Sequence, residues 1–263
     1  MDEAQALYEK ALLRLDKQPA LAESSRVDYG LAYLLLSRNE LQDAERQARL
    51  SMQVAQQAGD TLGRADAYRI LGIIASQKHE HRTSLECNER SLELYRKLGD
   101  LPRIAQACNN VGDCCRQRGL TGRAVERLQE GLEVARAIGS VAGEALLRQT
   151  KGELLLDLGE WQRAVEELEL ARKAARSCAV VSRVMGARRA LGVAYESVGR
   201  FDQARCELEA AEELMRQTQH LRFGADLYLD LAHLGASEGR FDEAEGWLSR
   251  AMEQGGSTGT RTS

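Results

Sequence analysis

The chain has 263 residues, of which 43% are hydrophobic and 29% are charged, and its formal net charge is −4. This mild negative charge argues against a direct nucleic-acid partner, because such proteins are usually basic. No apolar run approaches the roughly 20 residues that span a bilayer, so we expect no membrane partner. No signal peptide is visible at the N-terminus, and we expect a cytoplasmic protein with reduced cysteines.

The composition favours helices throughout. Ala, Leu, Glu, Arg and Gln dominate, all of which form helices well, and there are only two prolines. No stretch alternates apolar and polar β-branched residues as a strand would. At this length, either two domains or a repeat array is expected. We therefore predict an all-α fold.

The predicted elements begin with a single helix over residues 2–17, which matches the second helix of a repeat and has no first helix before it. Six two-helix units are predicted to follow, at about residues 20–60, 61–100, 101–140, 141–180, 181–220 and 221–254. Together they predict a single solenoid over residues 1–254, and residues 255–263 are rich in Gly, Ser and Thr, which predicts a flexible tail. Solenoids usually need capped ends. We therefore expect the chain to be an excerpt of a longer protein, or an end to be covered by a partner.

The third unit illustrates the predicted boundaries. Its first helix is expected from Leu101 to Arg118 and its second from Thr121 to Ile138. Gly119 suits the left-handed conformation that ends a helix. After the second helix, Ser140 can cap the helix that follows.

Small residues recur every 40 positions in four columns, which include Gly72, Gly112, Gly152 and Gly192 in the first helices and Ala124, Ala164, Ala204 and Ala244 in the second. A fixed period of this size indicates stacked supersecondary units. Glycine inside a helix costs about 1 kcal/mol relative to alanine. Close helix packing is therefore the expected reason for the glycine column.

These columns resemble the tetratricopeptide repeat family. Its pattern is a Leu-Gly pair in the first helix, seen at Leu71-Gly72, and then Ala, a bulky residue and a small residue in the second, seen at Ala164, Leu168 and Ala171. The turn Gly159-Glu-Trp161-Gln-Arg-Ala164 has near-identical copies beginning at Gly199 and Gly239. The period of 40 exceeds the family's commonest 34, and Gly-Asp mostly replaces its helix-ending proline.

The resemblance implies a right-handed superhelical α-solenoid of about six and a half antiparallel helix-turn-helix repeats. The long repeat is similar to arrays in kinesin light chain, in spindle and cell-polarity adaptors, and in bacterial signal-transduction ATPase regulators. Those arrays imply a module that binds a protein or peptide, as part of a larger signalling or regulatory protein. Two alternatives remain: a small-ligand sensor array of a transcription regulator, and a structural scaffold that self-associates end to end.

In that fold the first helices line the concave face, which is the usual binding surface of solenoids. Residues three before and one after the small residue are four apart, and so adjacent on the helix. With positions one turn further on, the predicted partner-binding residues are Tyr29, Tyr33, Arg69, Asn109, Asp113, Arg116, Gln149, Glu153, Arg189 and Glu196. Asn109 and Arg189 occupy columns that clamp a C-terminal carboxylate in some family members. Asp113 and Glu153 intrude there, which favours a peptide of both charges.

A second candidate surface is a basic patch. Between Ala171 and Tyr195 the chain has basic residues and no acidic ones, and the patch comprises Arg172, Lys173, Arg176, Arg183 and Arg188. An acidic partner could bind there. The alternative is that acidic residues of neighbouring units, such as Glu167 and Glu207, neutralise it.

The sequence shows no catalytic constellation. It has no phosphate-binding glycine loop, no nucleophile elbow and no His-Glu-x-x-His motif. His79 and His81 flank Glu80, but a third metal ligand at helical spacing is missing, so a polar turn is the favoured interpretation. We expect no enzyme activity, no metal and no cofactor.

Overall fold

The computed structural model describes Leu7 and residues 21–218 and 224–257, and every regular element in these ranges is an α-helix. The predicted all-α class is thus confirmed. The helix predicted over residues 2–17 lies outside the described residues, apart from helical Leu7. The last described helix extends to Ser257, three residues into the segment predicted as a tail. The helix can extend into this segment because each residue added to an existing helix gains one hydrogen bond without a new nucleation step.

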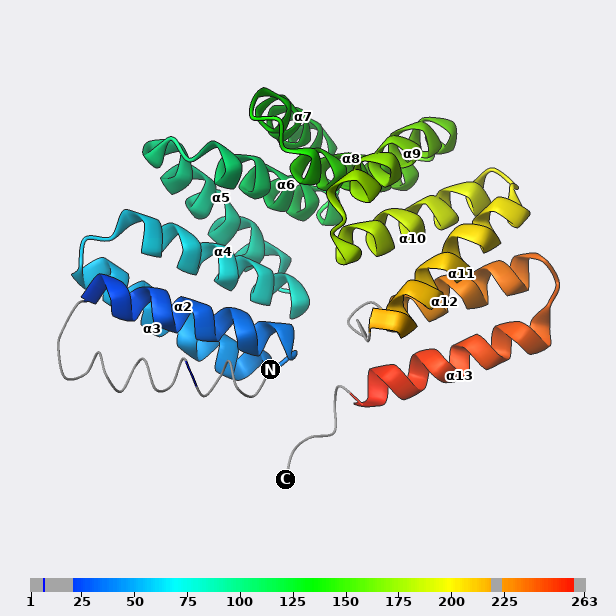
Figure 1. The fold of residues 1–263 in the computed structure, drawn as a ribbon, viewed down its shortest axis with the longest axis horizontal. Coiled ribbons are helices and arrows are strands. Elements are labelled where there is room, and N and C mark those ends of the chain that lie inside the picture. The colour runs from blue at the N-terminus through cyan, green and yellow to red at the C-terminus, as the bar shows by residue number, and fades with distance from the viewer. Residues whose placement is uncertain (1–6, 8–20, 219–223, 258–263) are drawn as a thin grey trace. The chain divides into compact units, whose positions relative to one another are not determined.

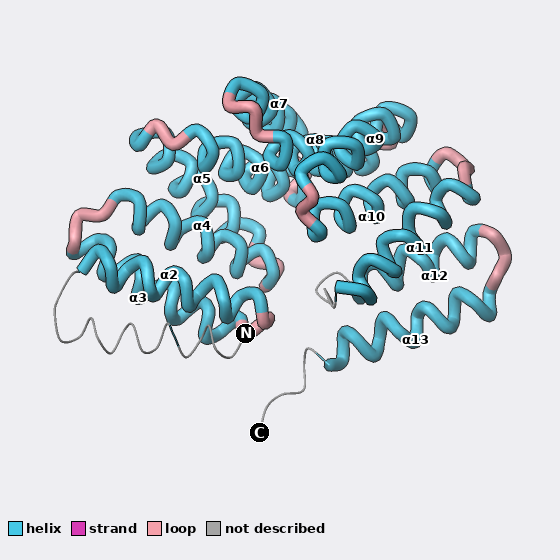
Figure 2. The backbone as a smooth tube through the Cα atoms, in the orientation of Figure 1, coloured by secondary structure: helices cyan, strands magenta, loops and turns pink. Residues whose placement is uncertain are grey.

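The helices form pairs joined by short turns, which Figure 2 shows as pink segments between cyan helices. The pairs are α2 (Leu21–Ser37) and α3 (Leu41–Gln57), α4 (Thr61–Gln77) and α5 (His81–Leu98), α6 (Leu101–Gln117) and α7 (Thr121–Ala137), α8 (Val141–Asp157) and α9 (Trp161–Cys178), α10 (Val181–Ser197) and α11 (Phe201–Thr218), and α12 (Gly224–Ser237) and α13 (Phe241–Ser257). We call the first helix of each pair the A helix and the second the B helix.

The chain divides into two compact units, residues 1–134 and residues 135–263, with the division inside α7. In unit 1, α2 packs against both α3 and α4, and α5 packs against α4 and α6. In unit 2, α10 packs against α8, α9, α11 and α12 (Figure 1). The consecutive A helices α2 and α4 therefore contact each other in unit 1, and α10 contacts both α8 and α12 in unit 2. That all six pairs form one continuous solenoid stays a prediction.

The glycine column lies where A and B helices cross. A Cβ atom added to Gly152 would lie 2.4 Å from Cγ of Leu168, and one added to Gly192 would lie 2.5 Å from Cγ of Leu208. Both leucines are completely buried. The close approach that the repeat period predicted is thus the reason for glycine at these positions.

The turns follow the predicted punctuation. Gly119 ends α6 with a φ of 67°, in the left-handed region. Ser140 accepts a hydrogen bond from the backbone N of Gly143 at 3.1 Å and so caps α8. Within the described ranges, the non-glycine residues Asn39, His79 and Ala179 also adopt a positive φ at turns.

Candidate functional site

The A helices of unit 1 carry a polar contact between consecutive repeats. Arg69 of α4 donates a hydrogen bond to the hydroxyl of Tyr29 on α2, 40 positions earlier, and its guanidinium lies 5.7 Å from the centre of the Tyr29 ring. Arg69 is buried, with 8% of its surface exposed. Burial raises the pKa of Tyr29, and Arg69 opposes that shift. The predicted pair is therefore brought together and held in one orientation.

The third A helix contributes a pair on a single helix. Arg116 donates to Asp113 from Nε at 2.9 Å, and its Nη2 lies 2.8 Å from the same carboxylate oxygen. Asn109, one turn earlier, is 6% exposed. Because both are buried, Asn109 and Arg69 have little surface on which a ligand could bind. That these two residues contact a ligand directly stays a prediction.

In unit 2 the central polar contact joins α10 to α12. Arg189 donates from Nε to Oδ2 of Asp230 at 2.5 Å, and its Nη1 lies 3.6 Å from Oδ2 of Asp226. Burial raises the pKa of Asp230, although Arg189 opposes the shift, and the negative charges of Asp226 and Glu196 add to it. Burial alone would lower the pKa of Arg189, but the negative charge of Asp230 and its hydrogen bond raise it, so the net shift is upward.

Glu196 makes a second connection between the same two helices. Its Oε1 accepts a hydrogen bond from Ser237 Oγ at 2.7 Å and lies 2.6 Å from Nδ1 of His233. On α8, Gln149 donates from Nε2 to Glu153 at 2.9 Å. The predicted residues of unit 2 thus form polar contacts along and between consecutive A helices.

Two surfaces can now be defined. The A-helix face of unit 1 comprises Tyr29, Tyr33, Arg69, Asn109, Asp113 and Arg116, and that of unit 2 comprises Gln149, Glu153, Arg189, Glu196, Asp226, Leu229, Asp230 and His233. Tyr33 and Leu229 are large side chains with 54% and 49% of their surface exposed. Neither Asp226 nor Asp230 was among the predicted site residues. The available signal was that Leu229 occupies the position of Arg189 one repeat later, with Asp226 three residues before it and Asp230 directly after it.

The basic patch is partly neutralised. Arg172 donates a hydrogen bond to Glu207 on α11, and Arg188 donates to the other oxygen of the same carboxylate at 2.7 Å. Arg183 also has interaction partners. Lys173 and Arg176 are exposed on α9. The alternative of neutralisation therefore holds for Arg172 and Arg188, and binding of an acidic partner stays a prediction.

The remaining sequence candidates lie apart from these surfaces. The rings of His79 and His81 meet edge to face, with centroids 6.0 Å apart. Among the described residues, no three His, Cys, Asp or Glu side chains gather as a metal would require. Within the same ranges, none of the helices has the length and apolar character to cross a bilayer.

Unit 1 also holds a cavity of about 440 Å³ between α3, α4 and α5. Its lining includes the apolar side chains of Met52, Tyr68 and Leu71, together with Arg49 and Lys78. Both cations bind Glu45, and these hydrogen bonds lower the pKa of its carboxyl group. The cavity combines an apolar lining with charged groups.

Comparisons with solved structures show related folds. BtubC (BKLC) from P. vanneervenii is 18% identical with a TM-score of 0.66, over 83% of this chain and 92% of that chain. A STAND signal-transduction ATPase of Pyrococcus horikoshii, which has a tetratricopeptide repeat sensor, is 20% identical with a TM-score of 0.66. The match covers 96% of this chain but only 40% of the ATPase.

A third structure is the Rap conjugation gene regulator of plasmid pLS20 in complex with the Phr* peptide. It is 14% identical, with a TM-score of 0.76 over 97% of this chain and 69% of that one. At these identities the likeness concerns the fold alone. A search of curated proteins gives no match.

Family models settle the classification. Two models of the tetratricopeptide repeat match residues 63–137 and 150–219, which together are more than half of the chain. Both matched ranges consist of the helix pairs described above, with Gly112, Gly152 and Gly192 at their crossings. The chain belongs to the tetratricopeptide repeat family.

Proposed function

We propose that this protein is an interaction module that binds a peptide or a protein segment on the A-helix faces of its units. The observation that carries the proposal is the combination, on one face, of fixed polar side chains with exposed large ones. In unit 2, Arg189 and Glu196 are held by hydrogen bonds to α12 beside the exposed Leu229. Side chains fixed before binding lose less conformational entropy when a ligand arrives.

The charges of unit 2 define the ligand further. Glu153, Asp226 and Asp230 all act electrostatically on Arg189, and Glu196 lies near Asp230. Carboxylates therefore outnumber the guanidinium on this face. A segment with Lys or Arg side chains complements them, and the apolar side chain of Leu229 offers a contact for an aliphatic residue.

The fold comparisons are consistent with this role. The Rap regulator of plasmid pLS20, which is similar over 97% of this chain, was solved with a bound peptide. A part in signalling or regulation, as in the STAND ATPase with its repeat sensor, belongs to the same proposal. In that case the module would be the sensing part of a larger protein.

The test is a screen of fluorescein-labelled octapeptides by anisotropy, with half of the library carrying two Lys or Arg residues. We expect hits to concentrate in the basic half. The variant Tyr33→Ala/Leu229→Ala, changed at one exposed residue in each unit, should weaken binding by about tenfold or more. Leu50→Ala/Leu170→Ala is the matched control, because both leucines are similarly exposed but lie on B helices.

Two outcomes would count against the proposal. In one, no library member binds at concentrations up to about 1 mM, which corresponds to roughly −4 kcal/mol. In the other, the B-helix control loses as much affinity as the A-helix variant, which would move the binding surface elsewhere. Circular dichroism of each variant establishes that the helices are retained.

A second candidate function is small-ligand sensing, favoured by the cavity between α3, α4 and α5. Its volume of about 440 Å³ lies within the range of small-molecule sites. Thermal shifts with a metabolite library distinguish the two functions. A ligand that stabilises the wild type and Tyr33→Ala/Leu229→Ala, but not Met52→Glu, would assign sensing to this cavity.

A further inference from the structure

The cavity between α3, α4 and α5 has an apolar lining to which all three helices contribute. Ile74 and Ala75 of α4 are 2% and 4% exposed, and Leu71 of the same helix also lines the cavity. Met52 from α3 and Cys87 from α5 line the same space, and both are half-buried. The cavity, of about 440 Å³, is therefore formed within unit 1 alone.

The repeat period identifies the equivalent positions in unit 2, three periods of 40 residues later. Three residues of the lining correspond there to a hydrogen-bonded cluster of charges: Met52 to Arg172, Tyr68 to Arg188 and Cys87 to Glu207. Both arginines donate hydrogen bonds to Glu207, which is 5% exposed. In unit 2 these positions therefore bind one another across three helices. A thioether, a phenol and a thiol have no opposite charges that would draw them together in the same way.

A small residue opens the cavity further. Ala75 corresponds, again three periods later, to Tyr195 of α10. The hydroxyl of Tyr195 donates a hydrogen bond to Glu169 of α9 at 2.7 Å, and Tyr195 is 4% exposed. Unit 2 thus holds a buried ring that reaches the preceding B helix at this position, whereas unit 1 holds a methyl group. The cavity is therefore a consequence of particular side chains in α3, α4 and α5, and not of the repeat as such.

The charged side chains at the cavity balance one another. Among the described residues that line it, Arg49 and Lys78 are cations, and Glu45 and Glu80 are carboxylates. Glu45 pairs with both cations, with Arg49 at 2.6 Å, and these hydrogen bonds lower the pKa of its carboxyl group. Glu45 is therefore ionised at neutral pH. A ligand with a net charge would meet no excess of the opposite charge here, and would lose hydration without compensation.

The uncharged groups of the lining indicate the ligand more closely. Tyr68 and Thr83 carry hydroxyl groups, and Gln53 and Gln56 carry amides. Small-molecule sites combine apolar walls with a few such groups, which fix the orientation of the ligand. The sulfur of Met52 also favours contact with an aromatic ring. A cavity of about 150 Å³ holds benzene, so one of about 440 Å³ accommodates two fused rings and a polar group.

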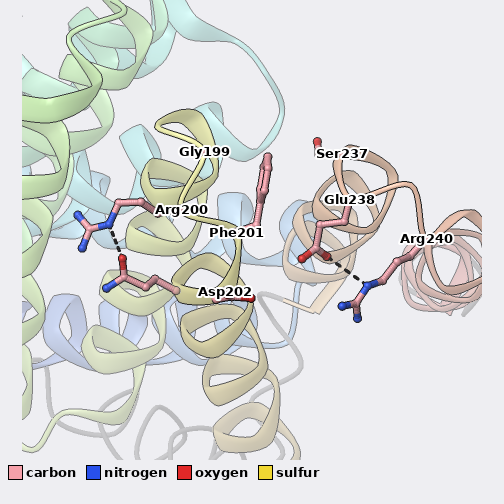
Figure 3. Close-up of a pocket in the computed structure, with 8 residues that line it drawn as sticks. Gly199, Arg200, Phe201, Asp202, Ser237, Glu238 and Arg240 are labelled. Atoms are coloured by element: carbon pink, nitrogen blue, oxygen red, sulfur yellow. Dashed lines mark hydrogen bonds and ion pairs between the residues drawn. The ribbon is translucent and has the colours of Figure 1, made fainter.

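Unit 2 has a larger cavity with a different lining, about 600 Å³ between the turns that precede α11 and α13. Figure 3 shows the residues around Phe201, which is the one large apolar side chain among the described residues that line this cavity. Arg200 donates a hydrogen bond to Gln203, and Glu238 pairs with Arg240 at 3.8 Å. This cavity therefore lacks the apolar walls that would hold an uncharged ring.

We propose that the cavity between α3, α4 and α5 binds an uncharged bicyclic aromatic molecule that carries a hydrogen-bonding group. This inference rests on the second proposed function, small-ligand sensing, and names the class of ligand for it. The rings pack against Leu71, Ile74 and Met52, and the polar group bonds to the amides or hydroxyl groups of the lining. Because the lining comes from two consecutive helix pairs, the ligand stabilises both pairs together.

The probe is indole, compared with tryptamine and indole-3-acetate, which add a positive and a negative charge to the same rings. Calorimetric titration should show that indole binds at least about tenfold more tightly than either analogue. Saturating indole should also slow the reaction of Cys87 with N-ethylmaleimide by about threefold or more, because this thiol lines the cavity. Peptide mass spectrometry resolves the thiols, and Cys178, a half-buried thiol of unit 2, is the internal control.

Ala75→Leu should abolish indole binding, because the larger side chain occupies the space. The repeat accommodates leucine at this position, since Leu155 is the equivalent residue of α8 and is 6% exposed. Ala236→Leu is the matched control, made at an exposed alanine of α12, and should bind indole as the wild type does. Protection of Cys87 is measured in the wild type, and so tests the proposal whether or not Ala75→Leu folds.

Three kinds of result would overturn the proposal. Absence of indole binding at about 1 mM, or binding without protection of Cys87, would exclude this class of ligand from the cavity. Equal binding by Ala75→Leu and the wild type would place indole elsewhere. Equal affinity for the charged analogues would overturn the ligand class, while a metabolite hit lost in Met52→Glu would leave small-ligand sensing in place. A metabolite library with no stabilising member would instead contradict the sensing function itself.

Discussion

Arg189 and Asp230 are 41 positions apart in the chain, yet Nε of the arginine lies 2.5 Å from Oδ2 of the aspartate and joins α10 to α12. Both side chains are largely withdrawn from solvent, with 33% and 20% of their surfaces exposed. A partly buried charge that loses its partner is costly, because the remaining group is desolvated without compensation. The contact therefore orders the A-helix face of unit 2 and couples its stability to pH.

The first prediction concerns Arg189→Gln. Burial raises the pKa of Asp230 in the folded state. The stability that this shift contributes is therefore fully present below the pKa of an unfolded aspartate, about 3.9, and is lost as the pH rises through the pKa of Asp230 in the folded state. Arg189 limits this rise, so its removal should enlarge the loss and extend it to higher pH. We expect a decrease of about 1–3 kcal/mol in unfolding free energy at pH 7, and a smaller one at pH 4.

Urea unfolding at both pH values measures this difference. Arg189→Gln/Asp230→Asn is the control, since it removes the buried charge and should recover part of the stability at pH 7. An equal loss at pH 4 and pH 7 would mean that the arginine stabilises through packing rather than through its charge.

The second prediction is an order of thiol reactivity. Cys206 is exposed, whereas Cys108 and Cys114 are buried. Burial raises the pKa of Cys108 to about 12 and that of Cys114 to about 11. Because the thiolate is the reactive form, Cys206 should react with Ellman's reagent at pH 8 at least about a hundredfold faster than these two. Cys206→Ser should remove the fastest phase, and its persistence would contradict the assignment.

The repeat period accounts for how much of the fold could be predicted. Once Gly72, Gly112 and Gly152 fix the crossings, the turns between them follow from local residues, and the predicted ends of the third pair lie within one residue of those observed. Ser140 and Gly119 could be assigned their roles because capping and left-handed φ depend on the residue itself and its immediate neighbours. These are local properties, which one sequence contains.

The candidate site depends on contacts between repeats, and there the sequence is less informative. Arg69 and Tyr29 share a column, so their proximity could be expected. Asp230 does not share the column of Arg189, and only the packing of α10 on α12 shows that it is the partner. Likewise, the sequence left open whether the basic patch is free or neutralised by residues such as Glu207, and only the fold shows that both Arg172 and Arg188 bind Glu207.

The third prediction tests the glycine column with Gly152→Ala. The added methyl group would lie 2.4 Å from Cγ of the buried Leu168, which must shift away. Overpacking of this kind should lower the unfolding free energy by about 1–3 kcal/mol. The control is Gly122→Ala in α7, where a Cβ atom meets nothing within 4 Å, and which should raise stability by about 0.5–1 kcal/mol. If the two substitutions changed the unfolding free energy in urea equally, helix propensity and not close packing would explain the effect of alanine in the glycine column.

The last prediction concerns the turn between α9 and α10, where two stabilising features of the other turns are missing. Ala179 adopts a φ of 52°, whereas Gly59, Gly99 and Gly139 hold the equivalent left-handed position elsewhere. Val180 then precedes α10 without a side-chain cap, while Asp60 and Asp100 cap the helices that follow their turns. A left-handed residue with a Cβ atom costs about 1–2 kcal/mol.

Ala179→Gly should therefore raise the unfolding free energy by about 0.5–1 kcal/mol, after the greater chain entropy of glycine is subtracted. Val180→Asp should add about 1 kcal/mol by accepting a hydrogen bond from the first turn of α10. Urea unfolding measures both effects, and hydrogen exchange should slow first at the N-terminus of α10. Destabilisation by Ala179→Gly would show that the alanine side chain makes a packing contribution larger than the strain of its backbone, so that the turn is held by contacts and not by local conformation.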